Sequence, residues 1–150
     1  MKKGWRWILL LFGMILTWQC LREPTAVRTL ESVLVVDLPR GIGVEYTDTH
    51  GGFHGDGELN AAVMFQSAKQ GERFVRQISD TWMPLPAKTE ILSAVRREWA
   101  ELPMVEEGYW MFRDRYFEQY GERTSYRLWN STFAVLDTEE WMLYVFELDL

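Results

Sequence analysis

Residues 128–148 of this 150-residue chain read LWNSTFAVLDTEEWMLYVFEL, and they decide its fold. Two runs rich in β-branched and aromatic residues, 128–136 and 141–148, flank the polar stretch DTEE at 137–140. Apolar runs joined by a short polar turn are typical of a β-hairpin. The chain therefore ends in two antiparallel strands, to which the preceding segments are expected to add.

Upstream, the sequence predicts three strands, at 32–38, 42–49 and 58–65. The first is the β-branched run SVLVVDL, which ends at the turn residues PRG. The glycine-rich connection at 50–57 is too short for a parallel crossover, so the third strand is expected to return antiparallel to the second.

Between these strands and the C-terminal hairpin, apolar residues recur at helical spacing over 68–80 and 89–101. Ser67 is a suitable N-cap for the first of these helices. Prolines make 81–88 a loop, and the alternating segment 108–116 predicts another strand before a polar excursion containing one helical turn.

The expected fold is therefore an α+β domain. Its elements follow the order βββααβββ, with an antiparallel sheet, two helices packed on one face, and a hydrophobic helix preceding the whole.

The N-terminal segment is a targeting element. Residues 7–21, WILLLFGMILTWQCL, carry no charge and follow Lys2, Lys3 and Arg6. Positive charge on this side predicts that the N-terminus stays in the cytoplasm and the body faces outward. We expect residues 1–26 to form a membrane anchor or signal segment with a short tether over 22–30, and residues 27–150 to form one extracytoplasmic domain.

Three interpretations of this segment place the body outside the cytoplasm, and the fourth is a buried helix of a cytosolic protein. Tryptophans at both ends of residues 5–21 favour an uncleaved anchor in the bacterial cell membrane. The length of the apolar run favours a cleaved signal peptide and a secreted product. Cys20, just after the apolar run, resembles the lipidated cysteine of a bacterial lipoprotein, although TWQ before it departs from that pattern.

Charge and cysteine content exclude other classes. The net charge is -6, and residues 1–23 carry four basic residues and one acidic residue, so the rest of the chain carries -9. An acidic body without a basic stripe argues against nucleic acid as a partner. The single cysteine rules out an intramolecular disulfide.

The segment DTHGGFHGDG at 48–57 holds both histidines of the chain. Imidazole and carboxylate groups bind divalent metals, so Asp48, His50, His54 and Asp56 are candidate ligands. The alternative is a purely structural turn, because glycines provide positive φ angles and aspartates hydrogen-bond to turn backbone.

A second candidate is the pair Arg113 and Arg115. Strand alternation places both on one face, as a carboxylate clamp or as a solvated surface. No serine lies in a nucleophile motif such as G-x-S-x-G, and Cys20 lies in the targeting segment. These observations weigh against an enzyme.

The blocks DTHGGFHGDG, EEGYWMFRDRY and FAVLDTEEWMLYVFELD resemble an uncharacterised family of small bacterial proteins that are membrane-anchored or secreted. The resemblance covers scattered blocks of residues 45–150. It implies an outward-facing bacterial domain and no catalytic residues.

We therefore expect a membrane-tethered, non-enzymatic binding module with an envelope protein as its partner. The alternative is a metal-dependent binder or hydrolase that uses His50 and His54.

Overall fold

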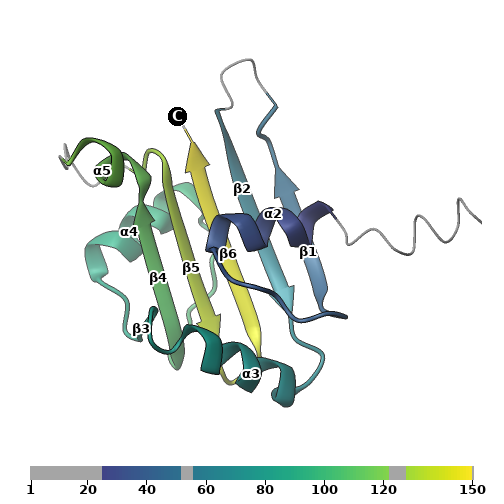
Figure 1. The fold of residues 1–150 in the computed structure, drawn as a ribbon. Coiled ribbons are helices and arrows are strands. Elements are labelled where there is room, and N and C mark those ends of the chain that lie inside the picture. The colour runs from purple at the N-terminus through teal and green to yellow at the C-terminus, as the bar shows by residue number, and fades with distance from the viewer. Residues whose placement is uncertain (1–24, 52–55, 122–127, 150) are drawn as a thin grey trace, which may run out of the picture.

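The computed structural model describes residues 25–51, 56–121 and 128–149, which form an α+β fold around one antiparallel sheet (Figure 1). The sheet has six strands in the order β1-β2-β6-β5-β4-β3. In chain order the elements are α2 (Thr25–Leu34), β1 (Gly43–Asp48), β2 (Gly57–Met64), α3 (Ala68–Ile78), β3 (Met83–Pro84), α4 (Thr89–Glu98), β4 (Gly108–Asp114), α5 (Arg115–Tyr120), β5 (Ser131–Asp137) and β6 (Met142–Asp149).

The C-terminal hairpin is confirmed and lies inside the sheet. β5 pairs with β6, and their outer neighbours are β4 and β2. Asp137 closes the turn, because its Oδ1 accepts hydrogen bonds from the backbone N–H groups of Glu139 and Glu140 at 2.8 and 3.0 Å. The most apolar strands thus occupy the most buried positions.

The antiparallel pairing of the strands expected at 42–49 and 58–65 is also confirmed, as β1 and β2. The two central helices are present as well. Ser67 caps α3, and its Oγ accepts from the backbone N–H of Gln70.

The expectation for residues 22–38 is wrong where the structure describes it. The predicted strand at 32–38 and most of the tether at 22–30 are replaced by helix α2 and the turn that follows it. The β-branched run favoured a strand, but Val27, Leu30 and Leu34 recur at helical spacing. Leu30 and Leu34 are buried in the core, so packing on the sheet outweighs the local β propensity.

The placement of both helices on one face is also wrong. Of the two predicted helices, α3 packs in the same core as α2 through Phe74 and Ile78, whereas α4 packs in the other core and lies on the face opposite α2 (Figure 1). β5 is buried from Ser131 to Leu136, with Ala134 and Leu136 in the α2-side core and Phe133 and Val135 in the α4-side core. Strands that are apolar on both sides need cover on both sides.

The element order therefore differs from βββααβββ. The polar excursion after β4 is helix α5, which Asp114 begins by accepting from the N–H of Phe117 at 2.8 Å. The loop at 81–88 contributes the two-residue edge strand β3.

The hydrophobic segment at 5–21, including Cys20, lies outside the described residues. Among the helices that the structure does describe, none has the length and hydrophobicity to cross a membrane.

Candidate functional site

A row of polar side chains crosses the sheet on the α2 side, near the end of the sheet where β1 and β6 finish. The strand register aligns the polar residues Thr132, Glu147 and Asp48. Glu147 pairs with Thr132 on one side and with Leu59 on the other, and Leu59 in turn pairs with Asp48. Apolar residues fill the remainder of this face toward α3. Polar groups thus replace core residues at one end of the α2-side face.

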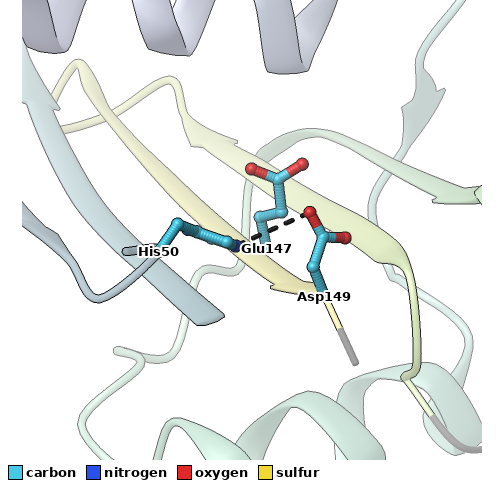
Figure 2. Close-up of side chains that lie close together, drawn as sticks. All are labelled: His50, Glu147 and Asp149. Atoms are coloured by element: carbon cyan, nitrogen blue, oxygen red, sulfur yellow. Dashed lines mark ion pairs between the residues drawn. The ribbon is translucent and has the colours of Figure 1, made fainter. Parts of the chain in front are cut away.

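His50 follows β1 and turns its imidazole into this row (Figure 2). Its Nδ1 lies 2.6 Å from Asp48 Oδ1, and its Nε2 lies 3.6 Å from Asp149 Oδ2. The Nε2 atom is buried and makes no hydrogen bond, although 20% of the side chain is exposed. The imidazole therefore directs an unsatisfied nitrogen at the carboxylates of β6.

Gly57 makes this approach possible. Its strand partner is Asp149, and His50 packs directly over it. A Cβ atom at position 57 would lie 2.6 Å from the His50 backbone N and Cα atoms and 2.8 Å from its Cδ2. The missing side chain is what allows the imidazole to lie against β6.

Arg115 holds the other side of the two carboxylates. Its Nη1 donates to Glu147 Oε1 and, at 2.8 Å, to Thr132 Oγ1, and its Nη2 donates to Asp149 Oδ1. Arg113 instead donates to Glu118 in a bidentate pair. The two arginines therefore do not form the joint clamp considered from the sequence, because Arg115 is the first residue of α5 and each arginine pairs with different carboxylates of this chain.

The environment shifts two carboxyl groups in opposite directions. Burial raises the pKa of Glu147, which Arg115 opposes and Asp149 reinforces. The hydrogen bond from Tyr46 lowers the pKa of Asp48, against the effect of partial burial and with further help from His50. Asp48 is therefore the more firmly ionised of the two.

Three possible metal-ligand atoms lie close together. One nitrogen of His50 and one carboxylate oxygen each of Glu147 and Asp149 lie within 4.8 Å of one another. Bonds of about 2.1 Å to tetrahedral zinc place two ligand atoms about 3.4 Å apart. The 3.6 Å separation of His50 Nε2 and Asp149 Oδ2 is close to that value.

The structure distributes the four ligands expected from the sequence differently. His50 faces the cluster, whereas Asp48 binds its far nitrogen and so lies behind the imidazole. Asp56 is exposed just before β2. His54 lies outside the described residues, and its role as a ligand stays a prediction.

Sequence reasoning missed Glu147 and Asp149, which lie about 100 positions after His50 in the chain. One signal was present in the sequence. Strand alternation places these two charged residues on the same face of β6 as Leu143 and Val145, where an apolar side chain is expected. Charged groups on a buried face are rarely found without a partner or a function.

No protein-family model, curated protein or solved structure matches the chain. The resemblance to a family of small bacterial anchored proteins therefore stays a prediction, and function must be argued from the site.

Proposed function

We propose that the protein binds a divalent transition-metal cation, with Zn²⁺ as the first candidate, through His50, Glu147 and Asp149. The observation that carries this proposal is the buried Nε2 atom of His50, which lacks a hydrogen-bond partner and lies 3.6 Å from Asp149 Oδ2. A lone pair directed at a carboxylate is unfavourable unless a proton or a cation lies between them. Mixed imidazole and carboxylate ligands suit zinc better than calcium or magnesium.

The charge of the cluster supports a dication. Asp48, Glu147 and Asp149 are three carboxylates, and Arg115 supplies one compensating charge. With a neutral imidazole, the formal charge of the cluster is about -2 at neutral pH. Arg115 engages one oxygen of each β6 carboxylate, and the other oxygen of Asp149 is the one that faces His50.

The proposal also includes the location and partner expected from the sequence. Residues 5–21 would hold the domain at the outer face of a bacterial membrane, where an envelope protein would meet it. Cell fractionation of the full chain tests this, because a salt-resistant membrane pellet is expected. Recovery in the cytosolic fraction would contradict the tether.

A metal-dependent hydrolase is the second candidate function. Three protein ligands leave a coordination position for water, and zinc lowers the pKa of bound water to about 7. We favour the binding role because the hydroxyl groups described beside the ligands are already engaged, with Thr132 bonded to Arg115 and Tyr46 bonded to Asp48. Zinc-dependent turnover of an ester or phosphodiester substrate would reverse this preference.

Calorimetry with the detergent-solubilised full chain tests the cation site. Zn²⁺ is expected to bind the wild type with one-to-one stoichiometry, and His50→Ala is expected to lose at least tenfold in affinity. Asp56→Asn is the matched control, because Asp56 is exposed in the same connection and is not among the clustered ligands, and His54→Ala tests the glycine-loop site predicted from the sequence. Equal loss in His54→Ala would favour the glycine-loop site predicted from the sequence, and no binding by the wild type would end the proposal.

A further inference from the structure

We infer that Tyr46 and Asp48 are positioning residues of the cation site, which hold the His50 imidazole in the tautomer that leaves Nε2 free to bind a cation. The inference rests on the proposed function. Ligand histidines commonly donate their second ring nitrogen to a carboxylate, which fixes the ring and raises its basicity.

The hydrogen bonds of Asp48 identify the tautomer. Asp48 Oδ1 accepts from the backbone N–H of His50 at 2.9 Å and lies 2.6 Å from Nδ1 of the same residue. Both oxygens of Asp48 accept hydrogen bonds, and an ionised carboxylate can only accept, so Nδ1 carries the hydrogen. In the neutral ring, Nε2 then has the lone pair that faces Asp149.

Tyr46 holds the second oxygen of the same carboxylate. Its hydroxyl donates to Asp48 Oδ2 at 2.5 Å, which is possible because residues two apart on β1 share a face. With both oxygens engaged, the Asp48 carboxylate cannot rotate away from His50 without breaking a hydrogen bond. Tyr46 therefore acts on the cation site through Asp48 and His50.

Helix α2 completes the arrangement. The side chain of Thr29 hydrogen-bonds to Tyr46, so the chain of contacts runs from α2 through Tyr46 and Asp48 to His50. Networks of this kind fix geometry more strongly than single bonds do. The ring of Tyr46 packs against the α2-side core, so Tyr46→Phe removes the hydroxyl and retains the packing.

The experiment measures Zn²⁺ affinity of the full chain by calorimetry, with zinc alone as the probe. Tyr46→Phe and Asp48→Asn are each expected to bind Zn²⁺ about 10–100-fold more weakly than the wild type. Tyr109→Phe is the matched control, because Tyr109 is a half-buried tyrosine of β4 that packs against the same core. Its affinity is expected to be unchanged.

A second measurement needs no metal. Nitrogen-15 NMR of the His50 ring near neutral pH should show the neutral form protonated at Nδ1 in the wild type and a larger Nε2–H fraction in Tyr46→Phe. This spectroscopic signature would not change if Tyr46 only stabilised the fold. If Tyr46→Phe fails to fold, Thr29→Val provides a second test of this series of hydrogen bonds. A smaller loss of Zn²⁺ affinity is expected for it.

The outcomes separate the two proposals. Wild-type protein that binds no Zn²⁺ overturns the proposed function, and the inference with it. Wild-type binding together with unchanged affinity in Tyr46→Phe and Asp48→Asn overturns the positioning role and leaves the cation site standing. A predominant Nε2–H tautomer in the wild type also overturns the positioning role.

Discussion

Gly57 is the residue at which one added carbon atom would most directly disturb the candidate site. We expect Gly57→Ala to displace His50 from β6, because the new Cβ would meet backbone atoms that have little freedom to shift. Overpacking of this kind costs about 1–3 kcal/mol, and Zn²⁺ affinity should fall at least tenfold. Urea denaturation and zinc calorimetry measure the two effects.

Gly51→Ala is the control for this substitution. Gly51 lies in the same connection, and among the described residues a Cβ there would meet only the Thr49 carbonyl oxygen, at 3.9 Å, an ordinary contact. Its stability and affinity should match the wild type. An equal effect of both substitutions would mean that the loop as a whole, and not the approach of His50 to Gly57, controls the site.

Glu147 predicts a pH dependence of stability. Its pKa is raised above the ordinary 4.5 by burial, so the folded state retains the proton where the unfolded state has released it. The free energy of unfolding should therefore fall as pH rises from 4.5 through the raised pKa, and each unit of pKa shift corresponds to about 1.4 kcal/mol. Asp48 acts in a different window, because its lowered pKa causes loss of stability only as pH falls below 3.8.

Urea denaturation of metal-free wild type and Glu147→Gln between pH 5 and 8 tests the direction of this pH dependence. The stability of the wild type relative to the variant should decrease with rising pH, because only the wild type has the titrating carboxyl, while Arg115, Asp149 and His50 face position 147 in both proteins. Glu139→Gln, in the exposed turn, should show no such trend. A relative increase with pH would show that pairing with Arg115 outweighs burial.

At the scale of elements, α3 packs closely against the C-terminal hairpin at Gly71. A Cβ at position 71 would lie 1.9 Å from Cε3 of Trp141. Glycine inside a helix normally costs about 1 kcal/mol relative to alanine, so its presence here has a packing reason. A residue with low helix propensity is thus the one that lets the helix pack against the C-terminal hairpin.

We therefore expect Gly71→Ala to destabilise the domain by about 1–3 kcal/mol in urea, despite its higher helix propensity. Glu72→Ala, at the exposed neighbouring position, should change stability by less than about 0.5 kcal/mol. A net gain of stability in Gly71→Ala would show that Trp141 moves aside without cost.

Elements with a single dominant signal could be predicted from the sequence. The two hairpins had alternating apolar residues and turn signals, α3 and α4 had helical periodicity, and α3 also had the capping residue Ser67. Residues 25–34 had conflicting signals, and the outcome depended on the burial of Leu30 and Leu34 against strands that come later in the chain. Local propensity could not weigh that contact.

At the scale of the whole molecule, the candidate site joins the loop after β1, the end of β6 and the start of α5. A cation bound there should stabilise the entire fold. At a free Zn²⁺ concentration 100-fold above the dissociation constant, the free energy of unfolding should rise by about 2.7 kcal/mol.

Urea denaturation of the full chain with and without Zn²⁺ measures this linkage. His50→Ala should show much less stabilisation at the same concentration, and Mg²⁺ should have little effect on either protein. Equal stabilisation of wild type and His50→Ala by Zn²⁺ would place the binding elsewhere on the acidic surface.

The sequence by itself determined the α+β class, the antiparallel hairpins, the acidic body and His50 as a candidate metal ligand. These properties depend on composition and on periodicity over a few residues. Only the tertiary structure decided that α2 and α4 cover opposite faces, and that His50 meets Glu147 and Asp149 and not the carboxylates nearest in sequence. The reason is the strand order, because placing β6 beside β2 brings the end of the chain under a loop that lies about 100 residues earlier.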